Sequence, residues 1–312
     1  MSQAHFIINP ASGAGAGARL ARELATLVGQ TQVSLLGRCD LTAVMAGLGM
    51  EDIAVACGGD GTASAVAEVI AERGLAAPAM GVIPLGTGND LARVLGYSHL
   101  SHDLPALIAQ LHHSTRRQLD RWRVEGPDLR LTWCNYLSVG ADARVAQMFH
   151  HLRLRHPRLV RGGNINRGIY GLLGAQQRNI DLARQVRLRS AATLPEWASV
   201  MVLANIPSYA GGATLARGMR CDDGHLEMVA LGHGVSLGLV TARLRRPRLL
   251  AQIEQVEFDL SAPLAMQADG EPFTARPGHY RVQRDRSIRV LVADGAPYDP
   301  LPIMRKRKQM NY

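Results

Sequence analysis

Short apolar runs alternate with longer amphipathic segments over roughly the first third of the chain. The runs have the length of buried strands, and the segments between them repeat apolar residues at helical spacing. Strands are predicted at residues 6–9, 33–36, 53–57 and 80–83, and helices at 18–28, 41–48, 64–73, 90–95 and 104–112. Strands and helices that alternate in this way predict βαβ units around a parallel sheet.

The pattern changes near Asp120, where closely spaced strand-like runs are separated by turn residues. Strands are predicted at 121–124, 129–139, 200–205, 226–231, 256–260, 264–268, 280–284 and 288–292. Helical inserts are predicted at 145–154 and 165–177, and a further amphipathic stretch covers 238–250. We therefore expect an α/β domain at residues 1–120 and an antiparallel β-sandwich domain with helical inserts at 121–294.

Three glycine-rich turns follow strands of the predicted parallel sheet. They are Asn9-Pro10-Ala11-Ser12-Gly13 with the glycines after it, Gly58-Gly59-Asp60-Gly61-Thr62, and Pro84-Leu85-Gly86-Thr87-Gly88-Asn89-Asp90. Glycine lets backbone N–H groups approach a ligand, and the helix N-terminus that follows favours an anion. Asp60 and Asp90 would repel an anionic ligand bound at these turns unless a cation lay between them, and Mg²⁺ would be such a cation. A single turn of this kind is ordinary in an α/β sheet. The occurrence of several such turns in one domain predicts a nucleoside-triphosphate site.

Three large classes of nucleotide-binding protein do not fit these turns. The first turn lacks the Gly-Lys-Ser/Thr of a Walker A loop, and no turn fits the dinucleotide fingerprint. The protein-kinase glycine loop works with a strand lysine, but the chain has only Lys306 and Lys308. Phosphate contacts are therefore expected from backbone amides, hydroxyl groups and a metal ion.

The net charge and the amino-acid composition limit the classes of partner that the chain is expected to bind. Its net charge of +9 predicts an acidic partner, either nucleic acid or an anionic membrane. An aromatic content of 4% and the lack of any nucleic-acid-binding motif favour the membrane. The cysteines are scattered, and neither a signal peptide nor a membrane span is recognisable, so a cytoplasmic protein is expected. Arginine-rich segments at 150–161 and 238–250 could dock on lipid or could simply be solvated.

Several motifs resemble those of one enzyme family. The three turns, in this order and spacing, resemble the soluble diacylglycerol, sphingosine and ceramide kinases. Four later segments resemble the catalytic and accessory regions of eukaryotic-type diacylglycerol kinases, namely Leu119-Asp120-Arg121-Trp122, Asn135-Tyr136-Leu137-Ser138-Val139-Gly140, Asn205-Ile206-Pro207-Ser208-Tyr209-Ala210-Gly211-Gly212 and Gln267-Ala268-Asp269-Gly270-Glu271-Pro272. NAD kinases share the GGDGT turn but not the last two segments. The resemblance implies an NAD-kinase-like first domain, completed by residues 295–312, and a catalytic core that covers nearly the whole chain.

The resemblance also implies roles for single residues. ATP would be held by the three turns, through Asn9, Pro10, Ser12, Gly13, Gly58, Gly59, Asp60, Gly61, Thr62, Thr87, Gly88 and Asn89. Asp60 and Asp90 would serve Mg²⁺ directly or through water. Asp269 and Glu271 match the acidic pair that includes the catalytic base, and the residues leave open which acid it is. Asp223 matches a structural Mg²⁺ loop, with the carbonyl groups of Arg220 and His225 as partners.

These expectations combine into one function with two alternatives. The chain is expected to phosphorylate the primary hydroxyl of diacylglycerol to phosphatidate, at the inner membrane face and with homodimers as one option. The acceptor could instead be a sphingoid base, ceramide or phosphatidylglycerol. From a different class, the chain could be a nucleotide- or membrane-binding module without catalysis.

Overall fold

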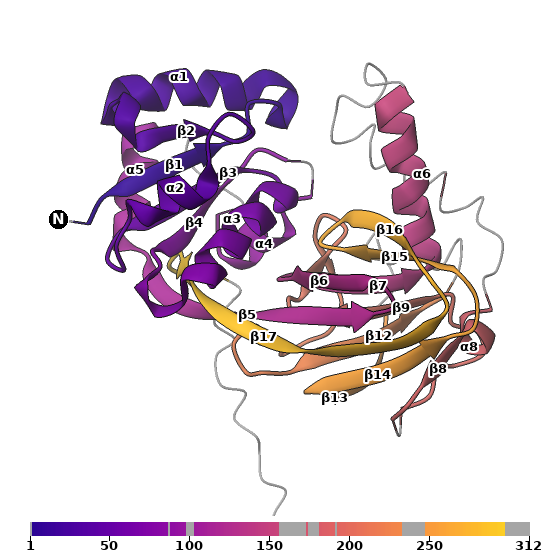
Figure 1. Cartoon of the computed structure of the whole chain (residues 1–312). Coiled ribbons are helices and arrows are strands. Elements are labelled where there is room, and N and C mark those ends of the chain that lie inside the picture. The colour runs from indigo at the N-terminus through magenta and orange to yellow at the C-terminus, as the bar shows by residue number, and fades with distance from the viewer. Residues whose placement is uncertain are drawn as a thin grey trace, which may run out of the picture.

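The computed structural model describes residues 2–86, 88–97, 103–155, 173, 181–190, 192–232 and 247–296. Figure 1 shows two lobes joined by long strands, with the N-terminus in the helix-rich lobe. Thr87, the predicted helix at 165–177 except for residue 173, and most of the amphipathic stretch at 238–250 lie outside the described residues. Within the described part of the chain, no helix is long and apolar enough to cross a membrane.

The first lobe contains the predicted parallel sheet, in the order β2-β1-β3-β4. Its strands are β1 (Ala4–Ile8), β2 (Val33–Leu35), β3 (Ile53–Gly58) and β4 (Ala79–Pro84). The α-helices are α1 (Ala16–Val28), α2 (Leu41–Ala46), α3 (Asp60–Arg73), α4 (Asp90–Val94) and α5 (Leu104–His113), with short 3₁₀ turns at Ser12–Gly15, Gln30–Gln32 and Gly74–Ala76. The sheet buries Phe6, Ile7 and Val55 completely, and these side chains belong to the hydrophobic core of this lobe.

The second lobe is built from antiparallel strands in two layers. One layer has the order β13-β12-β9-β7-β15-β16. Its strands are β7 (Tyr136–Gly140), β9 (Val200–Ala204), β12 (Leu226–Leu231), β13 (Arg248–Ile253), β15 (Leu264–Ala268) and β16 (Glu271–Ala275). The other layer contains β5 (Thr115–Gly126), β6 (Leu129–Trp133), β8 (Val186–Leu188), β14 (Gln255–Leu260) and β17 (Gly278–Val292). The β-sandwich expectation is confirmed, because buried side chains of both layers, including Trp122, Trp133 and Met201, form one hydrophobic core.

Smaller elements complete the second lobe. Helix α6 (Ala141–Arg155) packs against β7, β15 and β16, and it projects from the lobe in Figure 1. The remaining elements are α8 (Leu182–Gln185), β10 (Ser208–Tyr209) and β11 (Ala213–Thr214). The hairpin of β10 and β11 returns toward the first lobe, because β10 lies against α4.

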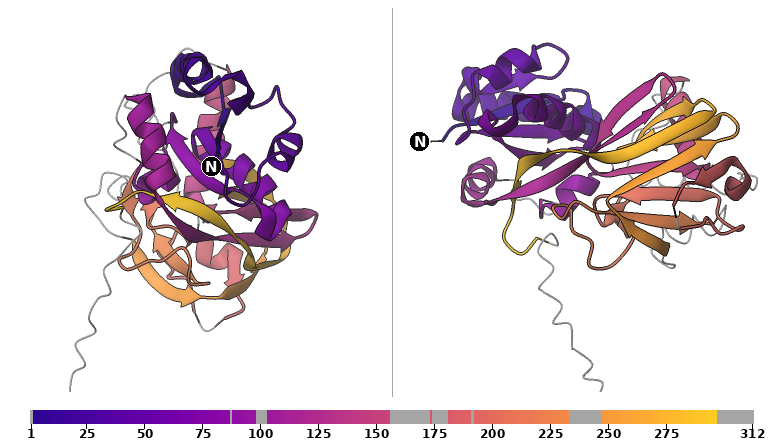
Figure 2. Two further views of the ribbon diagram at one scale, coloured as in Figure 1. Left: turned by 90° about the vertical axis from the view of Figure 1, so that its left-hand side faces the viewer. Right: turned by 60° about the horizontal axis from the view of Figure 1, so that its bottom comes forward.

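One strand, β17, belongs to both lobes. It pairs antiparallel with β14 and β5 in the second lobe and then lies parallel to β4, with Val290 opposite Met80. Figure 2 shows this yellow strand running from one lobe into the other. The sequence pattern suggested two strands here, because polar residues 285–287 interrupt the apolar alternation. The expected domain boundary near residue 120 and completion by residues 295–312 stay predictions, since residues 297–312 lie outside the described part.

The run 129–139 was expected to be one strand, but it forms two. Residues 129–133 pair with β5 in one layer, whereas residues 136–140 pair with β9 and β15 in the other. The polar pair at the break, Cys134 and Asn135, uses its backbone N–H groups to bind a carboxylate instead of a neighbouring strand. This crossover brings the second lobe to the carboxyl edge of the parallel sheet.

Candidate active site

The three glycine-rich turns meet at the carboxyl edge of the parallel sheet. A Cβ atom added at Gly13 would lie 2.9 Å from the carbonyl oxygen of Leu85, and one added at Gly86 would lie 2.6 Å from Cα of Gly59. The first and second turns are joined by Asn9 Nδ2, which donates to Thr62 Oγ1 at 3.4 Å. Because these close approaches leave no room for side chains, the turns form one continuous backbone surface.

The third turn is shaped by Asn89. This residue adopts a left-handed conformation with φ of 52°, and its side chain exchanges two hydrogen bonds with the backbone of Gly86. A small cavity between the second and third turns is lined by Gly58, Gly59, Asp60 and Asn89. Pro10 and Ser12 lie in the first turn, where Asn9 accepts from the backbone N–H groups of residues 11 and 12.

Asp60 begins α3 and is partly buried where the second and third turns meet. Its carboxylate accepts from the backbone N–H of Asp90 at 3.3 Å and of Leu91 at 3.2 Å. Burial, followed by the negative charges of Asp90 and Asp269, raises the pKa of Asp60 to about 6. A cation beside Asp60 would relieve this repulsion.

Asp90 is held from the other lobe. Its carboxylate accepts from Ser208 Oγ at 2.5 Å and from the backbone N–H of Gly211 at 3.1 Å. Both donors belong to the segment 205–212 that was singled out in the sequence. The segment therefore fixes the third turn against the second lobe, and the side chain of Asp90 is only 2% exposed.

Asp269 closes the contact between the lobes. Its carboxylate accepts from three successive backbone N–H groups, those of Cys134 at 2.9 Å, Asn135 at 2.8 Å and Tyr136 at 3.2 Å. A fourth donor is Ser64 Oγ of α3, at 2.8 Å. Burial raises the pKa of Asp269, and these hydrogen bonds oppose the shift. Asp269 is only 7% exposed, and its four donors come from both lobes. This carboxylate therefore holds the acid turn in place between the lobes.

Glu271 lies two residues further on and has a different environment. Its side chain is exposed, and a Cβ atom added at Gly61 would lie 3.4 Å from its Oε1 atom. Glu271 therefore presents an exposed carboxylate at the start of α3, beside the glycine turns. The left-handed φ angles of Asp269 (48°) and Gly270 (90°) turn the chain so that one acid faces inward and the other outward.

One face of α3 connects the two lobes. Residues 60, 64 and 68 lie one helical turn apart, so they share this face. Asp60 accepts from Asn135 Nδ2 at 3.5 Å, Ser64 donates to Asp269, and Glu68 pairs with Arg121 and accepts from Thr132 Oγ1 at 2.5 Å. The helix that begins at the glycine turn thus also positions the acid turn.

These residues fit Mg²⁺ together with phosphate oxygens. The described residues contain no group of three or more His, Cys, Asp or Glu side chains placed to hold an ion. Mg²⁺ does not need such a cage, because it is commonly bound by one or two carboxylates together with substrate phosphates. Asp60, whose charge is buried and repelled by its neighbours, is the carboxylate best suited to that role.

The predicted site residues divide into two groups. The described residues of the three turns lie together with Asp90, Asp269 and Glu271, whereas Asp223 belongs to a separate network described below. Ser64, Asn135 and Ser208 were not predicted as site residues. No local pattern could have identified them, because each acts through an acid that is distant in the sequence.

Comparisons with known proteins match both lobes. Residues 3–124 match the family model of the diacylglycerol kinase catalytic domain, and residues 132–272 match that of the diacylglycerol kinase accessory domain. The chain is 33% identical over 252 residues to diacylglycerol kinase 1 of Arabidopsis thaliana, which covers 71% of this chain and 35% of the relative. It is 32% identical over 326 residues to diacylglycerol kinase 2 of the same plant, covering 91% of this chain and 45% of the relative. The chain thus spans less than half the length of these relatives.

A solved structure shares the fold. The crystal structure of a diacylglycerol kinase from Bacillus anthracis superposes with a TM-score of 0.60 over 95% of this chain and 98% of that chain, at 12% identity. The two family matches cover the lobe that carries the glycine turns and the lobe that carries the acid turn. The chain belongs to the diacylglycerol kinase family.

Proposed function

We propose that this protein transfers the terminal phosphoryl group of ATP to the primary hydroxyl of diacylglycerol, giving phosphatidate and ADP. The observation that carries the proposal is the position of Glu271, an exposed carboxylate beside the N-terminus of α3 and next to the three glycine-rich turns. A triphosphate fits the turns by its charge, and a carboxylate next to its end can accept a proton from an attacking alcohol. Family membership supports the choice of lipid.

The proposed reaction assigns each group one task. The lipid hydroxyl oxygen forms a bond to the terminal phosphorus as the bond between that phosphorus and the β-phosphate oxygen breaks. The hydroxyl proton passes to Glu271, and ADP leaves with the electron pair of the broken bond. Asp269 holds the acid turn against Ser64, so Glu271 keeps its position relative to the glycine turns. Mg²⁺, bound through Asp60 and with Asp90 orienting the third turn, would neutralise charge on the phosphates.

A lipid panel tests this function directly. The protein is incubated with radiolabelled ATP and MgCl₂ in mixed micelles that contain diacylglycerol, a sphingoid base, ceramide or phosphatidylglycerol. We expect labelled phosphatidate from diacylglycerol and much less product from the others. Preferential labelling of another lipid would overturn the acceptor assignment. No labelled lipid at all, with ATP binding intact, would favour a binding module without catalysis.

We also propose that the protein works on an anionic membrane surface as a peripheral cytoplasmic enzyme. The net charge of +9 supports this, because each basic residue near an anionic surface contributes about 1 kcal/mol. Replacing Arg243, Arg245 and Arg246 by serine is expected to weaken binding to anionic vesicles in co-sedimentation and to raise the KM for lipid, with the KM for ATP unchanged. Arg276→Ser, at an exposed residue paired with Asp128, serves as the control. Equal binding to neutral and anionic vesicles would contradict this proposal.

A further inference from the structure

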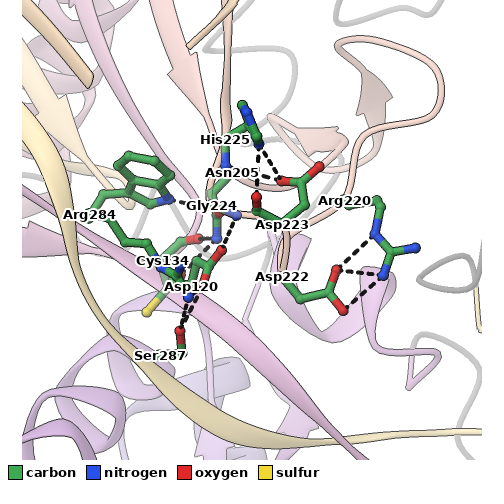
Figure 3. A network of polar contacts seen from close by, with 11 residues as sticks. Asp120, Cys134, Asn205, Arg220, Asp222, Asp223, Gly224, His225, Arg284 and Ser287 are labelled. Atoms are coloured by element: carbon green, nitrogen blue, oxygen red, sulfur yellow. Dashed lines mark hydrogen bonds and ion pairs between the residues drawn. The ribbon is translucent and has the colours of Figure 1, made fainter. Parts of the chain in front are cut away.

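Asp120 is a buried carboxylate outside the active site, and it has its own set of donors. Its side chain is 0% exposed. It accepts from the backbone N–H of Gly224 at 2.8 Å and from Ser287 Oγ at 2.6 Å, and it pairs with Arg284 Nη2 at 2.7 Å. Figure 3 shows these groups converging on Asp120. A buried carboxylate requires a counter-charge, and Arg284 supplies it here.

A β-bulge in β17 brings the two side-chain donors to the same place. Arg284 lies opposite Trp122 and Ser287 lies opposite Asp120, so three steps along β17 match two steps along β5. In a regular strand, side chains three residues apart point to opposite faces. The extra residue of the bulge corrects this and aims both side chains at Asp120.

The guanidinium of Arg284 also packs against the turn that contains Asp222, Asp223 and Gly224. Gly224 has a φ angle of +74°, and a Cβ atom added to it would lie 3.2 Å from Arg284 Nη1. The backbone N–H of Gly224 donates to Asp120, so carboxylate, guanidinium and turn are in mutual contact. Arg284 therefore joins this turn to the strands that connect the two lobes.

This turn is where the sequence suggested a structural Mg²⁺ ion, and its residues do not fit one. Asp222 is paired with Arg220 at 3.0 Å. Asp223 Oδ1 accepts from the backbone N–H of His225 at 3.1 Å, and the carbonyl oxygen of Asp223 lies 2.8 Å from His225 Nδ1. Arg220 neutralises Asp222, and Arg284 of β17 contacts the turn at Gly224, so a divalent cation here would meet positive charge.

The observation that most favours a cation here is Glu227, on β12. It is 4% exposed, and its Oε2 atom has no hydrogen-bond partner among the described residues. Burial and the charge of Asp223 raise its pKa to about 7. Its other carboxylate oxygen, Oε1, accepts from Gln252 Nε2 at 3.3 Å. The hydrogen bonds and the ion pair of Asp120 described above involve Gly224, Ser287 and Arg284 rather than Glu227.

We propose that Arg284 is the built-in counter-ion of Asp120 and the brace of the adjoining turn at residues 222–225, and that this turn needs no divalent cation in this chain. The guanidinium neutralises Asp120 and contacts the turn at Gly224. It is part of the protein chain, unlike a bound metal ion. Its contribution is therefore independent of the metal concentration.

Thermal unfolding of the nucleotide-free protein, with MgCl₂ or with excess EDTA, tests this role. The wild-type protein is expected to keep its Tm in both solutions. Arg284→Gln removes the partner of a buried charge and is expected to lower the Tm by about 5 °C or more in either solution. The matched control is Arg281→Gln on the same strand, because Arg281 has the same exposed fraction, 48%, and makes only weak contacts, a 3.7 Å pair with Glu257 and a 3.4 Å hydrogen bond to Gln255. The control is expected to leave the Tm nearly unchanged.

Two further variants, Arg284→Lys and Asp223→Asn, allow the thermal-unfolding test to be interpreted even if Arg284→Gln does not fold. Should Arg284→Gln fail to fold, Arg284→Lys retains the charge with fewer donors and is expected to fold with a lowered Tm. Asp223→Asn is expected to leave the Tm and its independence of Mg²⁺ unchanged. The proposal is overturned if Mg²⁺ raises the wild-type Tm and Asp223→Asn abolishes that rise, or if Arg284→Gln is as stable as Arg281→Gln. A rise that persists in Asp223→Asn would come from another site, such as Asp60, and would support the proposal.

Discussion

Replacing Glu271 by glutamine is expected to lower kcat for lipid phosphorylation by about 10²-fold or more. The substitution keeps the shape of the side chain but removes the carboxylate that we propose as the proton acceptor. Because Glu271 is exposed, the Tm and the affinity for ATP are expected to stay at the wild-type values. Steady-state kinetics in mixed micelles, calorimetric titration with ATP and thermal unfolding check the three expectations, and Glu196→Gln, at another exposed glutamate, is the control.

The Asp269→Asn variant tests whether Asp269 has a structural role or is itself the catalytic base. The asparagine NH₂ group would face backbone donors that now bind a carboxylate oxygen, at a cost of about 1–3 kcal/mol in the free energy of unfolding. This variant is therefore expected to lose Tm as well as kcat, and to keep the acidic limb of the pH–rate profile. If that limb disappears in Asp269→Asn and persists in Glu271→Gln, Asp269 is the base. If both variants keep kcat within about threefold of the wild type, the proposed chemistry is wrong.

The second large effect is expected from Gly86→Ala. A Cβ atom at this position would lie 2.6 Å from Cα of Gly59, so the second and third turns would have to move apart. Overpacking of this kind costs about 1–3 kcal/mol, and we expect ATP affinity to fall about tenfold or more.

Calorimetric titration with ATP measures this loss, and Gly47→Ala is the control. A Cβ atom added at Gly47 meets only the carbonyl oxygen of Val44, at an ordinary 3.5 Å. Wild-type ATP affinity in Gly86→Ala would mean that the triphosphate does not rest on the joined turns.

Local sequence patterns were enough to predict the parallel sheet and the sandwich. Apolar periodicity marks both kinds of strand, and glycine at a strand end marks a turn because few other residues fit there. The same reasoning could not find Ser64 or Ser208, whose partners lie far away in the sequence. It also could not separate the roles of Asp269 and Glu271, because two acids in one turn look alike until the burial of each is known.

The β-bulge in β17 escaped prediction for a related reason. Residues 285–287 read as a polar gap between two strands, although the polar groups are paired across β5. Asp285 lies 2.7 Å from Arg123, and Ser287 donates to Asp120. A pattern based on hydrophobicity alone cannot distinguish polar residues that are paired within a sheet from polar residues in a loop.

The path of β17 has a consequence for the order in which the protein folds during synthesis. Ile288, Val290 and Leu291 lie in the hydrophobic core of the first lobe, yet the ribosome adds them after nearly all of the second lobe. Until then, the edge of β4 that β17 covers has no partner strand, and such an edge invites pairing with other chains. The first lobe therefore cannot finish folding while it emerges, and its completion waits for contacts between residues about 200 positions apart, which form slowly.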